Sequence, residues 1–142
     1  MRLVSVKGNP DAEMILWDLL AERPRYAWIS HGEMPSRSAH AKFVEHHPFL
    51  YWYLIEAHGN YVGAIEVTDR NEIGVHILQE HQRKGYGIKA LRLFLDDHRP
   101  LPPIKAVRNG KWLANIATGN EAAKEFFAGA GFKKLQETWS LG

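Results

Sequence analysis

The chain has 142 residues, a size typical of one domain with a single hydrophobic core. Hydrophobic residues make up 45% and charged residues 24%, which is the composition of a folded protein and excludes a disordered tail or a fibre. The net charge is only +2, yet residues 83–111 carry +6 and the rest of the chain carries −4. This asymmetry favours an anionic ligand near the middle of the chain, with a merely solvated basic face as the alternative.

Several classes of site are excluded or disfavoured by residues that the sequence lacks. With no cysteine there is no disulfide, no thiolate metal site and no acyl-cysteine intermediate. The eight histidines show no H-E-x-x-H spacing and no G-x-S-x-G motif occurs, so we predict neither a metal site nor a serine hydrolase. No apolar run approaches the roughly 20 residues of a membrane span, and residues 1–14 do not resemble a signal peptide. We therefore expect a cytoplasmic protein that does not enter a membrane.

The first half of the chain predicts a short strand, two helices and three more strands. An alternating strand begins at about Val4, and Asn9-Pro10 opens a helix that Pro24 ends. Residues 36–47 predict a second helix, ended by Pro48. Apolar stretches at 49–57, 61–67 and 73–78 are separated by turn-sized gaps, which predicts an antiparallel meander.

The second half predicts a helix, a strand, a helix and a last strand. Apolar positions at helical spacing mark a helix at 88–97, and further elements are expected at 112–116 (strand), 120–132 (helix) and 133–141 (strand). Residues 98–111, with three prolines, receive no assignment. The order β-α-α-β-β-β-α-β-α-β predicts a single domain over 1–142, of the α/β (α+β) class, with a mixed, mostly antiparallel central sheet flanked by helices.

The stretch "QRKGYG", residues 82–87, lies between a predicted strand and a predicted helix. A helix N-terminus offers unpaired N–H groups and partial positive charge, and glycines let a phosphate approach them closely. A turn that needs glycine only for positive φ is the alternative. A P-loop is excluded because no Ser or Thr follows a Gly-Lys pair. "GYGIKA" matches a dinucleotide fingerprint, but six polar residues separate it from its strand, which disfavours that reading.

These residues resemble the Q/R-x-x-G-x-G/A signature of the GNAT superfamily of N-acetyltransferases. The preceding "NEIGVHILQEH" is similar to the family's fourth strand, and "NEAAKEFFAGAGF" is similar to its N-x-x-(S/A)-x-x-(F/L)-(Y/F)-x-x-x-G-F helix. The resemblance covers about residues 50–135 and is vague over the first 45. It implies an enzyme that moves an acetyl group from acetyl-CoA to a primary amine by direct attack in a ternary complex.

The resemblance also implies which residues hold acetyl-CoA. Main-chain groups near Ile77 and Leu78, at the end of strand four, would pair with the pantetheine arm, and an amide there would polarise the thioester carbonyl. Further residues would line the cofactor: Gln82, Arg83, Lys84, Gly85, Tyr86, Gly87 and Ile88 around the pyrophosphate, and Asn115, Asn120 and Phe127 elsewhere. Asn120 has a second explanation as a helix cap.

An amine of pKa near 10 is mostly protonated at neutral pH, so the reaction calls for a general base. Glu72 and His76 lie on one side of the predicted fourth strand and are the catalytic candidates, with a solvated turn residue and a core histidine as the alternatives. Phe127 stands where the family commonly has a tyrosine that protonates the leaving thiolate. Phenylalanine cannot donate a proton, so water or another hydroxyl, such as that of Tyr86, would have to serve.

Candidate acceptor-site residues are Trp28, Glu33 and Trp52, and Glu33 together with Glu56 or Glu66 would favour a cationic amine. The tryptophans could equally belong to the core. The resemblance implies a small-molecule or peptide amine as the acceptor, and a homodimer is left open. Two other functions remain: a non-catalytic CoA-binding or regulatory domain of the same fold, and a nucleic-acid-binding module, which the poor interleaving of aromatic residues disfavours.

Overall fold

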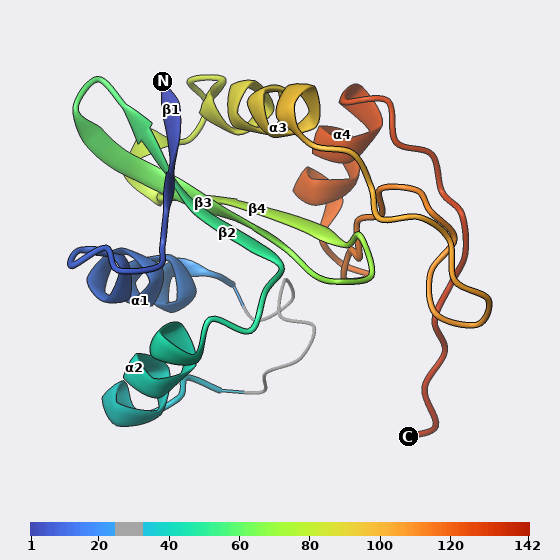
Figure 1. Cartoon of the computed structure of the whole chain (residues 1–142), viewed down its shortest axis with the longest axis horizontal. Helices are drawn as coiled ribbons and strands as arrows, with labels where there is room; N and C mark the ends of the chain where they lie inside the picture. The colour runs from blue at the N-terminus through green and yellow to red at the C-terminus, as the bar shows by residue number, and fades with distance from the viewer. Residues whose placement is uncertain (25–32) are drawn as a thin grey trace.

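The computed structural model describes residues 1–24 and 33–142. One antiparallel sheet crosses the middle of the molecule, with helices on both sides (Figure 1). Its strands, in spatial order, are β1 (Arg2–Ser5), β2 (Tyr51–Ala57), β3 (Asn60–Val67) and β4 (Ile73–Ile77). The predicted meander is confirmed, and the register places Gly63 opposite Ile77 and Glu66 opposite Gly74.

The helices are α1 (Ala12–Glu22), α2 (Arg37–His46), α3 (Tyr86–Asp97) and α4 (Glu121–Gly129), with one 3-10 turn, η2 (Gln79–His81). Helix α2 begins where predicted, because the Ser36 side chain accepts a hydrogen bond from the amide of Ala39. Helix α1 begins later than predicted. Asn9 uses its side chain in a local turn to Asp11, so the helix starts only at Ala12.

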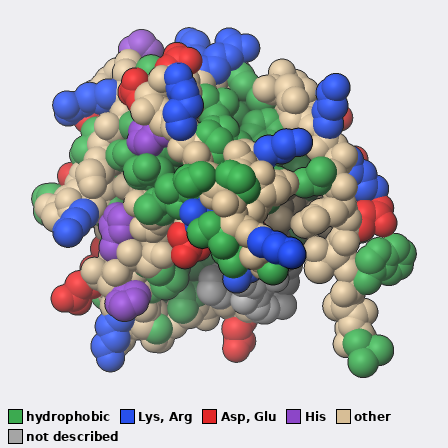
Figure 2. Space-filling model, turned by 45° about the vertical axis from the view of Figure 1, so that its right-hand side comes forward, with side chains coloured by type: hydrophobic (Ala, Val, Ile, Leu, Met, Phe, Trp, Pro, Cys, Tyr) green, Lys and Arg blue, Asp and Glu red, His purple; other side chains and the backbone are tan. Residues whose placement is uncertain are grey.

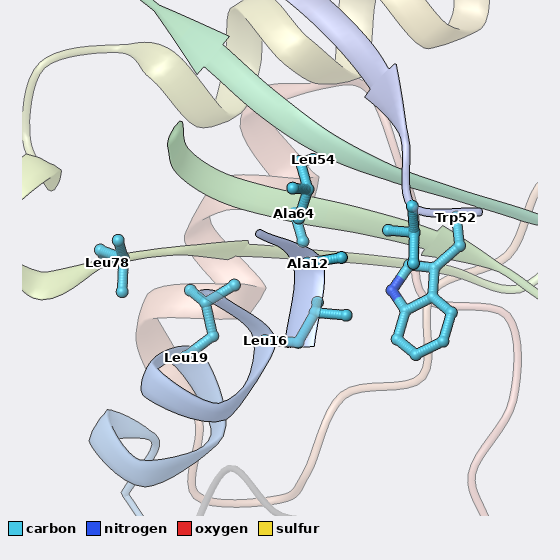
Figure 3. Packing of buried hydrophobic residues seen from close by; sticks show 8 residues of the cluster. Ala12, Leu16, Leu19, Trp52, Leu54, Ala64 and Leu78 are labelled. Carbon is cyan, nitrogen blue, oxygen red and sulfur yellow. The ribbon is translucent and has the colours of Figure 1, made fainter. Parts of the chain in front are cut away.

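Alternation along the strands divides the core into two sides. Ala12, Leu16 and Leu19 of α1 pack against Trp52 and other sheet residues on one face (Figure 3). On the other face, α3 and α4 cover the sheet through Leu91, Phe94 and Phe127, among others. In β4 the side chains of Ile73, Val75 and Ile77 belong to the α3 side, and Leu78 just after the strand belongs to the α1 side. Position 74 and the side chain of His76 therefore face α1.

Two predicted strands are not formed. Of residues 112–116, only Leu113 pairs with the sheet, in an isolated parallel bridge to Glu72. Residues 133–141 form no strand, and the C-terminal segment runs beside the irregular 100–112 region with Trp139 86% exposed (Figure 1). An apolar alternating segment becomes a strand only where another strand accepts its hydrogen bonds, and neither segment finds such a partner over its length. The mixed α and β class with a mostly antiparallel sheet is confirmed.

Candidate active site

The glycine stretch forms an exposed turn that leads into α3. Gly85 caps the helix in the left-handed conformation, with φ +78, and Arg83 is also left-handed, with φ +63. In the part of the chain that the structure describes, the amides of residues 83–88 have no hydrogen-bond acceptor, and the first helical bond is Lys89 N–H to Gly85 O. Among residues 1–24 and 33–142, no side chain caps the helix. Six consecutive N–H groups are thus available at the positive end of a helix.

Gly87 lies where α3, β4 and α4 meet. A Cβ at this position would lie 3.1 Å from Cε2 of Phe126 and 3.6 Å from Cγ1 of Ile77. The glycine therefore brings the amide-bearing turn close to the end of β4. Phe126, which the sequence analysis did not single out, is the α4 residue that contacts this point, while Phe127 is only 7% exposed and packs in the core.

The outer edge of β4 is open over most of its length. Leu78 N–H bonds to Val62 O, so by the antiparallel pattern Val75 and Ile77 direct their main-chain groups away from β3. Ile73 N–H uses the same outer edge to bond Leu113 O at 2.8 Å. Among the described residues, no acceptor is found for the N–H groups of Val75 and Ile77.

The main-chain directions along this edge correct the prediction of which residues at the end of strand four would pair with the pantetheine arm. The Leu78 amide is already paired with β3, and the Leu78 side chain is buried. Val75, which the sequence analysis did not name, has the outward position instead, and the hydrogen-bonding phase of the β3–β4 ladder is the signal that identifies it. The Ile77 carbonyl accepts a hydrogen bond from Nε2 of Gln82 at 3.0 Å, which ties the signature turn to β4.

Glu72 and Asn115 join the start of β4 to the segment that replaces strand five. The Glu72 carboxylate accepts hydrogen bonds from Oγ1 of Thr68, at 2.9 Å, and from Nδ2 of Asn115. Together with the Leu113 bridge, these contacts hold the two segments side by side at one point, beyond which they separate. Both oxygens of Glu72 are thus engaged in fastening the chain, and the Asn115 amide is engaged with them.

His76 belongs to a polar cluster on the α1 side of the sheet. Its Nε2 lies 2.8 Å from Oε1 of Glu66, and Nη2 of Arg23 lies 3.1 Å from Nδ1 and 3.3 Å from Nε2. Burial by itself raises the pKa of the Glu66 carboxyl, but His76 and Arg23 outweigh it and the net pKa is lowered. Burial lowers the pKa of Arg23, partly offset by Glu66. The sequence had suggested Glu66 only as a feature of the acceptor site.

Of the remaining predicted residues, some have structural roles, one is exposed on the surface and one lies outside the described residues. Trp52 is buried in the core against Phe43 and Phe49, as the structural alternative proposed. Asn120 caps α4 by accepting a hydrogen bond from the Ala123 amide at 3.1 Å. Glu33 is exposed, and Trp28 lies outside the described residues.

Glu56 and Tyr86 also have defined surroundings. Glu56 forms an ion pair with Arg2 of β1 at 2.9 Å, and β3 lies between β2 and the strand that carries His76. Tyr86, at the start of α3, has its ring within 6.3 Å of His58 and 6.5 Å of His81 between centroids. These are ring contacts, and they assign the Tyr86 hydroxyl no chemical role.

The surface is a mixture of apolar and basic groups. Figure 2 shows hydrophobic side chains gathered at the centre of one face, with Lys and Arg side chains around them. Within residues 1–24 and 33–142, no group of three or more His, Asp or Glu side chains is arranged to hold a metal ion. No helix in these two ranges is long and apolar enough to span a bilayer.

Comparison with known proteins agrees with this geometry. Residues 14–132 match the profile of the acetyltransferase (GNAT) family, which covers most of the chain. The chain therefore belongs to the GNAT family of acetyltransferases. It is an acyltransferase by family, with the antiparallel sheet and flanking helices described above. A search of curated proteins gave no match.

Two solved structures share the fold at low sequence identity. An acetyltransferase from Thermus thermophilus superimposes with a TM-score of 0.69 at 21% identity, over 96% of this chain and 88% of that one. A possible acetyltransferase from Clostridium difficile gives a TM-score of 0.65 at 14% identity, over 99% of this chain and 94% of that one. At these identities the similarity concerns the fold alone.

Proposed function

We propose that the protein transfers an acetyl group from acetyl-CoA to a primary amine, by direct attack of the amine on the thioester in a ternary complex. The observation that carries this proposal is the continuity of two unpaired sets of main-chain groups. The open edge of β4 at Val75 and Ile77 leads through Gln82 to the free amides at the start of α3.

An extended molecule with a diphosphate at one end fits these two sets together. The pyrophosphate of acetyl-CoA would accept hydrogen bonds from amides of residues 83–88, where the helix N-terminus favours an anion. The pantetheine arm carries two amide groups and would add to the sheet as a short strand beside Val75 and Ile77. One of these outward N–H groups would stabilise the oxyanion that forms as the thioester is attacked.

The basic side chains near the turn would support the same ligand. Arg83 and Lys84 are exposed beside the free amides and would add positive charge around the phosphates. Gly87 would let the phosphates approach the main chain, and Ile88 would supply its amide in the first helical turn. Phe126 contributes an apolar wall at the point where the turn meets β4.

A second candidate function is favoured by one position. Phe127 is buried and has no hydroxyl, so it cannot protonate a leaving thiolate. A CoA-binding domain without transferase activity would have the same open edge and the same turn. The two functions differ in turnover. The binding domain would bind CoA tightly but would release no thiol from acetyl-CoA when an amine is present.

A binding and turnover experiment distinguishes these functions. The melting temperature of the protein is measured with acetyl-CoA, CoA and NADH, and thiol release from acetyl-CoA is then followed with spermidine, glucosamine, puromycin and a short peptide with a free N-terminus. We expect stabilisation by acetyl-CoA and CoA but not by NADH, and amine-dependent thiol release. Stabilisation by NADH alone would contradict the proposal, and stabilisation by CoA without any release would favour the binding domain.

Three further expectations stay predictions: a single domain over 1–142, a cytoplasmic location and the homodimer that the sequence leaves open. Nucleic-acid binding through the basic residues 83–111 is the remaining alternative. It would appear as an affinity that falls steeply with salt concentration.

A further inference from the structure

The Glu66–His76 pair lies beside the proposed thioester site without a role in binding acetyl-CoA. We propose that His76 takes the proton from the acceptor amine and that Glu66 is its positioning residue. This inference rests on the proposed acetyl transfer to an amine, and it assigns to Glu66 and Gly74 roles that the family assignment does not give them.

Position along β4 favours His76 over Glu72 as the base. His76 lies between Val75 and Ile77, the two residues with outward N–H groups, and its side chain points to the α1 face. Glu72 is four residues away from His76, or about 13 Å along a strand. A thioester held at the open edge would therefore have the imidazole at its side and the Glu72 carboxylate well beyond it.

The contacts of the two side chains support the same choice. Both oxygens of Glu72 already accept hydrogen bonds, from Thr68 and Asn115. His76 keeps 26% of its side chain exposed, and among the described residues its ion-pair partner is Glu66. Glu72 is thus occupied in holding two segments together, whereas His76 can be reached from the α1 side.

The charge of Glu66 fixes which imidazole nitrogen carries the hydrogen. His76 and Arg23 keep the Glu66 pKa low despite burial, so the carboxylate is ionised near neutral pH and can only accept a hydrogen bond. Nε2 of His76, 2.8 Å away, must therefore be the protonated nitrogen of the neutral ring. The lone pair is then on Nδ1, which makes Nδ1 the proton acceptor.

Arg23 does not block this lone pair. Its Nη2 is almost equally distant from Nδ1 and Nε2, whereas a donor in line with the Nδ1 lone pair would be much farther from Nε2. The guanidinium nitrogen therefore lies against the face of the ring. Other charged groups near the cluster are Glu22, which accepts a hydrogen bond from the Gln79 amide at the end of α1, and Glu72 on the same side of β4.

Gly74 makes the pair possible. Glu66 is directly opposite Gly74, and His76 is two residues further along the same face. A Cβ on Gly74 would overlap Oε1 of Glu66 and lie 3.1 Å from Nε2 of His76. The carboxylate thus lies over the glycine to reach the imidazole diagonally across the two strands. Any larger residue at 74 would displace it.

The proposed step balances as follows. The ammonium group of the acceptor gives one proton to Nδ1 of His76, and the freed nitrogen attacks the thioester carbonyl carbon. The C–N bond forms, the C–S bond breaks, and the nitrogen loses a second proton, which the departing CoA thiolate takes up through water. The products are the acetylated amine and CoA thiol, and the proton on His76 returns to solvent.

The test compares His76→Gln and Glu66→Gln with the wild type, and uses Glu137→Gln as a control, since Glu137 is also a carboxylate in an ion pair and lies in the C-terminal segment. Binding of acetyl-CoA is measured by calorimetry, and kcat and KM are measured from pH 5.5 to 9 with the best amine of the panel above. We expect unchanged acetyl-CoA affinity in all variants. His76→Gln should lower kcat about 100-fold, the usual scale of a lost general base.

Glu66→Gln should lower kcat about tenfold and leave KM for the amine nearly unchanged, because the imidazole is then no longer held in place by a carboxylate. Glu137→Gln should change neither kcat nor KM. A His76→Gln variant with kcat within threefold of the wild type, or a Glu66→Gln variant with the kcat of the wild type, would overturn the proposal. Loss of acetyl-CoA binding by the wild type would instead overturn the proposed function.

A spectroscopic measurement decides the inference if no amine of the panel reacts. Long-range ¹⁵N–¹H spectra of histidine-labelled protein report which ring nitrogen of His76 is protonated. We expect the Nε2–H form in the wild type and a mixture of both forms in Glu66→Ala. A wild-type ring protonated on Nδ1 would refute the dyad.

Discussion

The side-chain amide of Gln82 donates a hydrogen bond to the carbonyl oxygen of Ile77 at 3.0 Å, so the turn before α3 is fastened to the last residue of β4. Gln82→Met keeps the length of the side chain and removes the donor. We expect CoA to bind about fivefold more weakly, which corresponds to about 1 kcal/mol for one hydrogen bond. Calorimetry with CoA measures this, with Gln136→Met as an exposed control, and equal affinity in both variants would show that the bond does not set the turn.

The outward direction of the Val75 N–H leads to a second prediction. Val75→Pro removes a donor that β3 does not use, and proline is tolerated at such edge positions. We expect the variant to fold and to lose most of its affinity for acetyl-CoA. Ser5→Pro is the matched control, because Ser5 occupies the same phase at the outer edge of β1 and lies far from the turn. Full acetyl-CoA binding by a folded Val75→Pro variant would exclude pairing at this edge.

Gly85 and Gly87 are expected to respond differently to alanine. Gly85 has φ +78 and open space around it, so Gly85→Ala should cost about 1 kcal/mol of folding free energy through backbone strain. Gly87 has no positive φ, but its new methyl group would press on Phe126 and narrow the approach to the amides. We expect Gly87→Ala to weaken CoA binding more than it lowers stability.

Urea unfolding and CoA titration separate the two effects. Gly129→Ala is the control, because Gly129 ends α4 without positive φ and with nothing near its Cβ position. It should leave both quantities nearly unchanged. The interpretation fails if Gly85→Ala is as stable as the wild type.

Asn71 is fully buried and connects three segments. Its side chain donates to Leu101 O at 3.0 Å and accepts from Leu101 N–H at 2.8 Å, and its carbonyl accepts from Leu113 N–H. Its φ is +65, a conformation that asparagine tolerates better than most residues. We expect Asn71→Ala to lower the free energy of unfolding by about 3 kcal/mol, since two buried hydrogen bonds are lost and two partners are left unsatisfied. Asn109→Ala, at an exposed asparagine, should cost far less in the same urea titration.

The lowered pKa of Glu66 predicts how stability depends on pH. A carboxyl whose pKa is lower in the folded than in the unfolded state stabilises the protein at pH values above its unfolded pKa, which is near 4.5. This contribution is lost as the pH falls through the lower pKa of the folded state. The stability difference between wild type and Glu66→Gln should therefore shrink between pH 6 and pH 3. Urea unfolding at both pH values measures this, with Glu121→Gln, at an exposed ion pair, as the control. A constant difference would mean that Glu66 is not ionised in the folded protein.

Much of the fold could be predicted because local chemistry decided it. The turns at 58–59 and 68–72 set the meander, and the glycine stretch placed the start of α3. Residues 112–116 and 133–141 could not be predicted, because their apolar alternation suits a strand but pairing depends on a neighbour. Among the described residues, that neighbour is absent from the sheet apart from the single Leu113 bridge.

The candidate site was predicted in its residue types and less well in their roles. The signature residues 82–88 were found from glycine and charge, and His76 from strand alternation. Glu66, Arg23 and Val75 were missed as members of this site, because register and hydrogen-bonding phase decide what lies beside His76 and which amides face outward. Those are properties of paired strands, which a single sequence does not specify.

The short open edge of β4 would also limit how long the proposed ligand stays bound. Among the described residues, only Val75 and Ile77 of β4 can donate there, so acetyl-CoA bound as proposed would be held by few main-chain bonds and could leave without unfolding any part of the sheet. A full-length fifth strand would have covered Val75 and Ile77 permanently. By separating from β4 right after Leu113, the chain leaves its sheet incomplete at the place where, under the proposed function, CoA would be exchanged for acetyl-CoA.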